Sequence, residues 1–168
     1  MSKLMLSIAV GALAVAAPAA AQAALGPDAA SCRAGSGSPA LLVNVNGFKS
    51  REGTLRVQLY GGNPADFLAK GKKLRRIDLP VTASGPMRVC VAVPQPGRYA
   101  VAVRHDADGN GKSGWNDGGG FSRNPNISLT KLKPNYSDVA INVAGSVQPV
   151  DVVLNYRHGL SIRPIDRN

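Results

Sequence analysis

The sequence is poor in aromatic and histidine side chains, and this narrows the classes of function open to it. Its 168 residues include three Phe, one Trp, four Tyr and two His, and the aromatic residues are not interleaved with the basic ones. Proteins that bind single-stranded nucleic acid stack bases on aromatic side chains, so we expect no nucleic-acid partner. Two histidines also make a zinc site a poor expectation.

Long apolar runs are scarce as well. The longest covers Leu4–Val15, with a lysine before it and small residues after it. This is short of the ~20 residues of a membrane-spanning helix but typical of a secretory signal peptide. We therefore place a signal peptide at residues 1–23, with cleavage after Ala21 or Ala23. We expect no transmembrane segment after cleavage and a periplasmic or secreted location.

Cysteine occurs only twice, as Cys32 and Cys90. In an exported protein an even number of cysteines favours a disulfide. The bridge would tie residues 24–40, a Gly- and Ser-rich segment expected to be a flexible arm, to the rest of the fold. Two alternatives stay open from the sequence: a pair of unpaired thiols, with Cys90 buried in a strand, or lipidation of Cys32.

Acidic residues are half as numerous as basic ones, 10 against 20, for a formal net charge of +10. Such a charge favours contact with anionic surfaces, for example phosphate-bearing glycolipid or acidic polysaccharide. We therefore expect the partner to be an unidentified ligand or a cell-envelope component. The most basic stretch, residues 70–76, is interpreted as the exposed rim of an edge strand, where lysines prevent edge-to-edge association.

What the chain does contain is apolar alternation of period two, which predicts β-strands. The expected strands are 41–48, 54–60, 72–82, 87–93, 98–104, 137–143 and 150–156, with a weaker one in 126–134. We expect the first two to form a hairpin, and 98–104 to pair with 87–93. Residues 63–71 predict a short helical turn. The prediction is an all-β fold: one β-sandwich domain of about seven strands over residues 41–157, followed by a basic C-terminal tail over 158–168.

One loop stands out by its length and composition. Residues 106–124 follow the strand at 98–104 and are rich in Gly, Asp and Asn. Loops longer than roughly 12–15 residues without their own secondary structure are commonly functional. The loop is therefore the first place to look for a binding site.

The acidic residues of this loop have the spacing D-x-D-x-N-G-x5-D of a calcium-binding loop. The predicted ligands are Asp106, Asp108, Asn110, the carbonyl of Lys112, and Asp117. Two features depart from the usual pattern, because a strand precedes the loop and Asp replaces the customary final Glu. The alternative is turn chemistry, in which Asp and Asn side chains accept hydrogen bonds from nearby backbone N–H groups.

Catalysis has weak support, and we expect a non-enzymatic protein. His105 beside Asp106, with Ser113 and Ser122 nearby, allows a hydrolase as one alternative, but the motif G-x-S-x-G is absent. The other alternative is a structural envelope protein whose basic face contacts anionic glycolipid. A histidine at a strand end is more often a hydrogen-bonded structural residue than a base.

The candidate contacts for a ligand or partner are His105, Trp115, Phe121 and Arg123. Two interpretations of the aromatic pair stay open. Trp115 and Phe121 could fold back to cap one end of the sandwich, which we favour, or Trp115 could offer its ring to a sugar or peptide.

These motifs resemble a known family. The run PGRYAVAVRHDADGNGK, followed by GGGFSRN, is similar to the P-G-x-Y-A-x-x-x-x-H-D-x-x-G-N-G-K and G-F-S-N of the uncharacterised bacterial exported family catalogued as domain of unknown function 2141. The resemblance spans Leu41–Tyr156, although the shorter SGWNDGG replaces the family's segment with Pro and Glu-Gly. It implies a secreted or periplasmic β-sandwich, immunoglobulin-like or prealbumin-like. The family has no established activity, so no function follows from it.

Overall fold

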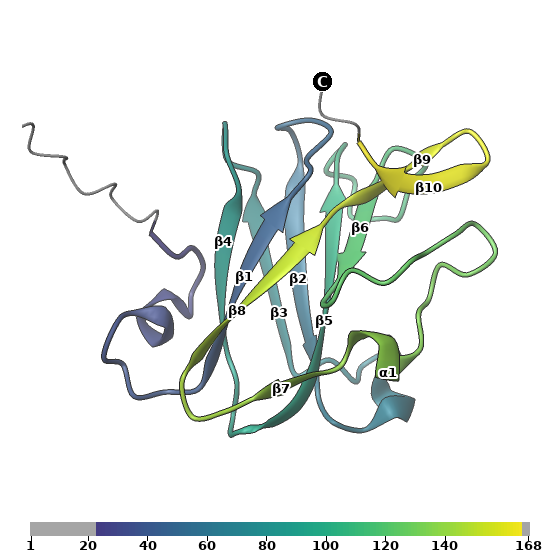
Figure 1. Cartoon of the computed structure of the whole chain (residues 1–168). Helices are drawn as coiled ribbons and strands as arrows, with labels where there is room; N and C mark the ends of the chain where they lie inside the picture. The colour runs from purple at the N-terminus through teal and green to yellow at the C-terminus, as the bar shows by residue number, and fades with distance from the viewer. Residues whose placement is uncertain (1–22, 166–168) are drawn as a thin grey trace, which may run out of the picture.

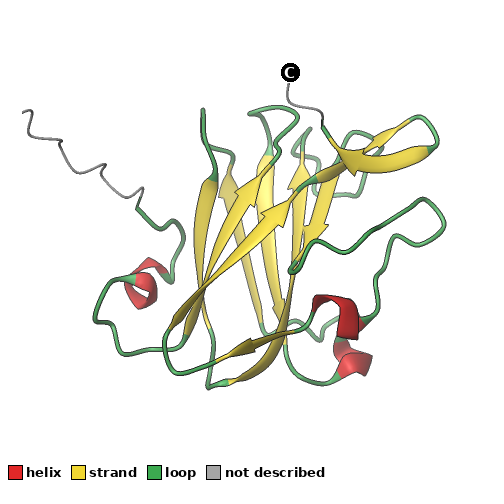
Figure 2. Ribbon diagram, in the orientation of Figure 1, coloured by secondary structure: helices red, strands yellow, loops and turns green. Residues whose placement is uncertain are grey.

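The computed structural model describes residues 23–165, which form a sandwich of two β-sheets (Figures 1 and 2). All but one residue of the expected signal peptide therefore lies outside the described residues. The strands are β1 (Ala40–Asn46), β2 (Thr54–Tyr60), β3 (Arg75–Pro80), β4 (Met87–Ala92), β5 (Gly97–Asp106), β6 (Gly118–Phe121), β7 (Ile141–Val143), β8 (Val147–Val153), β9 (Asn155–His158) and β10 (Ser161–Pro164). The helical elements are short: 3-10 helices η1 (Ala29–Cys32) and η2 (Pro64–Asp66), and α1 (Tyr136–Val139). The all-β sandwich is confirmed.

The smaller sheet has the order β4-β1-β8, with β1 antiparallel to β4 and parallel to β8. The larger sheet has the order β10-β9-β6-β5-β2-β3, and β7 pairs with the first residues of β5. Strand β3 lies at the edge, as Pro80 predicts, because proline cannot donate a ladder hydrogen bond. The long central strand β5 thus holds β2 on one side and β6 on the other.

The alternating apolar residues meet between the two sheets. On β1 and β2 the fully buried side chains are Leu41, Val43, Val45, Leu55, Val57 and Leu59. Most of the other buried side chains come from β4, β5 and β8. All of these side chains form one main core. A smaller apolar cluster forms on the outer face of β5, where Ala100 contacts Tyr136 and Val139 of α1. Burial on both faces explains why the middle of β5, residues 99–103, has no charged side chain.

The two expected hairpins are wrong. Strands β1 and β2 lie in different sheets, and so do β4 and β5. Apolar alternation fixes which face of a strand is buried, but it does not select the strand's partner. Each of these two connections crosses between the sheets, so the two strands that it joins lie on opposite sides of the core.

Four segments differ from the predicted elements. Residues 150–156, expected as one strand, are divided between the end of β8 in the smaller sheet and the start of β9 in the larger one. Residues 137–143 start as α1, where the carboxylate of Asp138 accepts a hydrogen bond from the N–H of Asn135 (3.3 Å), and only then become β7. Residues 126–134 contain no strand, only an isolated bridge between Ser128 and Lys131. Strand β6 is an addition, because glycine carries no side chain that could show alternation.

Both ends of the described chain are more ordered than expected. The predicted flexible arm packs on the sandwich through the disulfide Cys32–Cys90 and through Leu25, which forms a bridge with Val89 of β4. Residues 158–165, expected to be an aperiodic tail, contribute to the antiparallel hairpin β9–β10. The hairpin projects from one side of the molecule, above the long connection from β6 to α1 (Figure 1).

Candidate functional site

The acidic loop is the turn of the β5–β6 hairpin. His105 of β5 pairs with Gly118 of β6, so Asp106 and Asp117 come next on the two strands and face each other at the base of the loop. On the other side of β5, Gly53 has a φ of +76°, and a Cβ there would collide with the carbonyl of Asp106. The backbone before β2 thus packs directly against the start of the loop and fixes where Asp106 lies.

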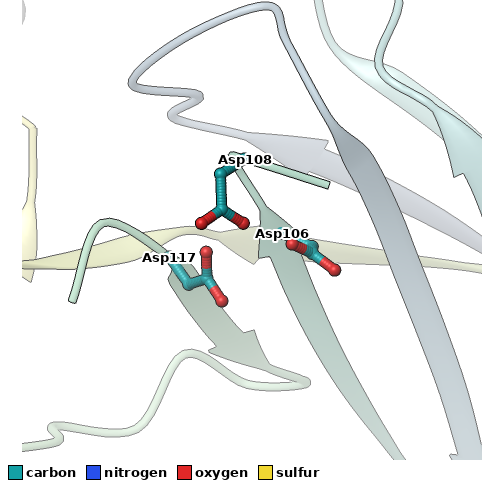
Figure 3. A group of neighbouring side chains, drawn as sticks. All are labelled: Asp106, Asp108 and Asp117. Atoms are coloured by element: carbon teal, nitrogen blue, oxygen red, sulfur yellow. The ribbon is translucent and has the colours of Figure 1, made fainter. Parts of the chain in front are cut away.

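Three carboxylates converge at this place. One oxygen each from Asp106, Asp108 and Asp117 lies within 4.8 Å of the others (Figure 3). Asp106 is buried, Asp117 is half-buried and Asp108 is exposed. The spacing in the sequence therefore identified three oxygen donors that the fold does bring together.

Much of the turn chemistry is also present. The Asp117 carboxylate accepts the N–H of Ala107 at 3.1 Å and that of Gly114 at 2.9 Å. Asp108 Oδ1 accepts the N–H of Asn110 at 3.1 Å. These bonds hold the loop in a shape in which its three acidic side chains point toward one another (Figure 3).

Asp106 is the exception, because one of its two carboxylate oxygens has no hydrogen-bond partner within residues 23–165. Its Oδ2 accepts the N–H of Gly111 (2.9 Å) and a guanidinium hydrogen of Arg104 (3.1 Å). Its Oδ1 is buried and has no hydrogen-bond partner among the described residues. A buried carboxylate oxygen without a donor loses its hydration without compensation. This oxygen is therefore the least satisfied atom of the loop.

The three carboxylates have one ion-pair partner among the described residues, Arg104. Arg104 lies one residue before His105 and forms the ion pair with Asp106, while its other guanidinium nitrogen bonds Ser113 Oγ. One guanidinium thus stands against three carboxylates in this group. Sequence reasoning missed Arg104, although its position two residues before Asp106, on the same face of β5, was the available signal.

One predicted ligand, Asn110, has another role in the loop. The Oδ1 of Asn110 accepts the N–H of Lys112 at 2.7 Å, and its amide nitrogen donates to Asp108 Oδ2 at 2.6 Å. Asn110 therefore shapes the turn and supports Asp108. Lys112 is exposed, so its ammonium is not forced into the acidic group.

His105 is not a surface contact residue. Its side chain is completely buried, its Nδ1 lies 2.7 Å from Tyr156 Oη, and its Nε2 lies 2.8 Å from the carbonyl oxygen of Glu52. Both ring nitrogens are thus used inside the fold, as expected of a structural histidine. Ser113 and Ser122 bond other groups: Ser122 Oγ is buried and donates to the carbonyl of Val139 at 2.6 Å.

Of the remaining candidate contacts, Trp115 lies at the surface, while Phe121 and Arg123 form contacts within the fold. Trp115 is 73% exposed and stacks under the guanidinium of Arg157, 3.4 Å from the ring centroid, so it does not cap the sandwich. Phe121 instead packs edge-on against Phe67. Arg123 donates to the carbonyl of Ser137 at 3.0 Å and so braces the connection to α1.

Comparisons with known proteins support the family and nothing more specific. The sequence model of a family described as an uncharacterized protein conserved in bacteria (DUF2141) matches residues 43–151. No curated protein and no solved structure matches the chain significantly. Within residues 23–165, no helix has the length and apolar character needed to cross a membrane.

Proposed function

Because this chain belongs to DUF2141, an uncharacterised family conserved in bacteria, we propose a function from the geometry of its own loop. The protein is a non-enzymatic, exported binding protein of the periplasm or the cell exterior. A calcium ion held by Asp106, Asp108 and Asp117 organises the loop at residues 106–124, and this loop presents the binding surface.

The observation that carries the proposal is the unpartnered Oδ1 of Asp106. This buried atom belongs to a carboxylate that shares its site with two others. A cation would supply the missing partner and offset the negative charge that Arg104 leaves unbalanced. The turn chemistry does not compete with this role, because it holds the backbone and orients the same side chains.

Calcium suits these donors better than a transition metal. All three side chains offer hard carboxylate oxygens, and the described residues bring no histidine or thiolate into the group. Calcium accepts six to eight oxygens in flexible geometry, so carbonyls of the loop and water would complete its shell. With three short carboxylates and an exposed position for Asp108, we expect a Kd of about 10⁻⁴–10⁻³ M, the range of extracellular modules.

Two further observations support the non-enzymatic and exported parts. His105, which lies at the start of the loop, uses both ring nitrogens in hydrogen bonds in the core. The disulfide Cys32–Cys90 is of a kind that persists in oxidising compartments. The hydrolase alternative would need His105 to leave the core before it could act as a base.

Calcium-dependent melting tests the proposal. In 10 mM calcium the protein should gain about 1.4–2.7 kcal/mol over its stability in chelator, from mass action at the expected Kd. Asp108→Asn should abolish most of this gain, because Asp108 is exposed and contributes a ligand without supporting the core. Asp66→Asn, a change at a half-buried acid paired with Lys72 far from the loop, is the matched control and should keep the gain. Equal melting in calcium and chelator would leave turn chemistry as the whole role of the loop.

A further inference from the structure

A cleft of about 470 Å³ adjoins the acidic loop. Three segments form its walls: the β5–β6 loop, the connection from β6 to α1, and the β9–β10 hairpin, whose projections share one side of the molecule (Figure 1). Its apolar lining consists of Trp115, Phe121, Ile127, Leu129, Leu132 and Ile162. A cleft of this size with mostly apolar walls is typical of a small-molecule site.

Three apolar side chains of this cleft are exposed to water. Trp115 is 73% exposed, Leu132 is 53% exposed and Leu129 is 36% exposed. Exposed apolar groups gathered in one place mark binding surfaces more often than isolated ones do. The cleft therefore offers a surface that an apolar chain would bury.

The polar groups of the cleft favour an anionic ligand. The guanidinium of Arg157 lies over the Trp115 ring, and its Nε donates to the carbonyl of Gly159 at 2.8 Å. No carboxylate of residues 23–165 forms an ion pair with it. Lys133, which is exposed, follows Leu132 in the sequence, and the whole chain carries a net charge of +10.

We infer that the cleft binds a single-chain anionic amphiphile. The acyl chain lies along the apolar wall of Trp115, Leu129 and Leu132. The anionic headgroup meets the guanidinium of Arg157, which donates charge-assisted hydrogen bonds to the phosphate oxygens. This ligand class deepens the binding role proposed above.

One residue connects the cleft to the cation site. Asp117 lines the cleft and is also one of the three converging carboxylates. Without a cation its charge repels an anionic headgroup, and a bound calcium ion cancels that repulsion. Calcium and the amphiphile therefore strengthen each other's binding, and the coupling is reciprocal. This part of the inference rests on the proposed calcium site.

Two lysophospholipids with the same acyl chain separate the contributions of chain and charge. Lysophosphatidylglycerol is anionic and lysophosphatidylcholine is zwitterionic, and both are titrated as monomers into the protein by calorimetry, in calcium and in chelator. We expect the anionic lipid to bind more tightly than the zwitterionic one. Its affinity should rise in calcium, and the affinity of the zwitterionic lipid should not.

Variants of the cleft test the two contacts independently. Arg157→Gln should weaken the anionic lipid about tenfold, the loss of one charge-assisted contact, and leave the zwitterionic lipid nearly unchanged. Leu132→Ser should weaken both lipids about fivefold through lost apolar burial. Leu74→Ser is the matched control, because Leu74 is 52% exposed at a distant edge of the larger sheet, and it should change neither affinity.

The outcomes distinguish the two proposals. Calcium-dependent melting without lipid binding, or with equal binding of both lipids, overturns the amphiphile inference and leaves the calcium site intact. Association with phosphatidylglycerol vesicles but not with the monomeric lipid also overturns it, in favour of a bilayer surface. Lipid binding that depends on Arg157 but is equal in calcium and chelator overturns the coupling, and the melting experiment then decides the calcium site alone.

Discussion

At the residue scale, the pair of His105 and Tyr156 is the polar centre beneath the acidic loop. The carbonyl of Glu52 can only accept, so His105 Nε2 carries the proton of the neutral ring. Nδ1 then accepts from the hydroxyl of Tyr156, which in turn accepts the N–H of Lys49 at 3.2 Å. Each polar atom of this buried chain has a partner, and the chain ties β5 and β9 to the connection before β2.

The ionisation of Tyr156 makes the fold sensitive to high pH. Burial raises its pKa to about 12, in spite of the hydrogen bond from Lys49 and the charge of Arg51, which lower it. In the unfolded chain a tyrosine has a pKa of about 10. The folded state therefore favours the neutral phenol. Its contribution is fully present below pH 10 and is lost as the pH rises to 12, by about 2–3 kcal/mol in all.

Urea unfolding of the wild type and of Tyr156→Phe between pH 9 and 12 measures this contribution. The variant lacks the hydroxyl, so it should be about 1–3 kcal/mol less stable at neutral pH, because His105 Nδ1 loses its partner. Its stability should also fall less steeply above pH 10. Other ionisations affect both proteins, and only the difference between the two curves reports on Tyr156. Parallel curves above pH 10 would contradict the assignment.

The residues of the acidic loop were predictable to different degrees. The spacing of Asp106, Asp108 and Asp117 was visible in the sequence, because a local motif needs only local chain geometry to bring its residues together. The ion pair of Arg104 with Asp106 was also within reach, because the two residues lie two positions apart on one face of β5. The burial of His105 depends on Tyr156, 51 residues further along the chain. Contacts of that range have no local signal.

At the scale of elements, β6 shows how a strand can be built from glycine. Its residues pair with β5 on one side, and Gly119 pairs with Asn155 of β9 on the other. A Cβ on Gly118 would lie 2.5 Å from the ring of Tyr156. Glycine thus lets the tyrosine lie against the backbone of β6, directly below the base of the acidic loop.

Alanine substitutions at neighbouring glycines test this packing. Gly118→Ala should destabilise the protein by about 1–3 kcal/mol, as overpacked cores do, because the added methyl meets the Tyr156 ring. Gly119→Ala should change stability by less than about 0.5 kcal/mol, since the nearest group to its Cβ would be the carbonyl oxygen of Val103 at 3.8 Å. Chemical denaturation measures both. Equal losses would show that backbone freedom, and not the tyrosine contact, is what β6 requires.

The elements found by alternation were those with one buried and one polar face, such as β1 and β2. Strand β6 was missed because glycine conceals the pattern. The start of residues 137–143 was misassigned because one helical turn is too short to show a period of 3.6. The β9–β10 hairpin was missed because only Tyr156 of its eight residues is buried.

At the scale of the whole molecule, the segment before β1 joins the two sheets along one edge. Asp28 is buried and forms an ion pair with Arg75 at the start of β3, and its Oδ2 also accepts the N–H of Ala92 at the end of β4, at 3.1 Å. The hydrogen bond and charge of Asp28 raise the pKa of Arg75. One carboxylate thus connects the edge strands of both sheets, next to the disulfide.

Loss of the disulfide should lower the stability substantially. Cys32 and Cys90 are 58 residues apart, and closing a loop of that length removes about 4 kcal/mol of chain entropy from the unfolded state in the chain-entropy model. The double variant Cys32→Ser/Cys90→Ser should therefore melt well below the oxidised wild type. Reduced wild type serves as the control and should match it. A variant as stable as the oxidised protein would mean that Asp28 and Leu25 suffice to hold the segment.

The fold class, the disulfide and the family were within reach of the sequence, because each depends on composition or on local pattern. The order of the strands was not. It depends on which of several similar apolar faces meet, and strands such as β1 and β4 carry nearly the same alternation.

The parallel pairing of β1 with β8 has a consequence for how the chain folds. Asn44 and Asp151 are paired across these strands and joined by a side-chain hydrogen bond, yet they are 107 residues apart. Strand β1 is the middle of its sheet, so one of its edges stays unpaired until residues 147–153 have been synthesised. Contacts of such long range form slowly. A chain that ends before β8 cannot complete its core, and neither sheet is complete until residues 147–164 have been synthesised, because β9 and β10 of the larger sheet follow β8.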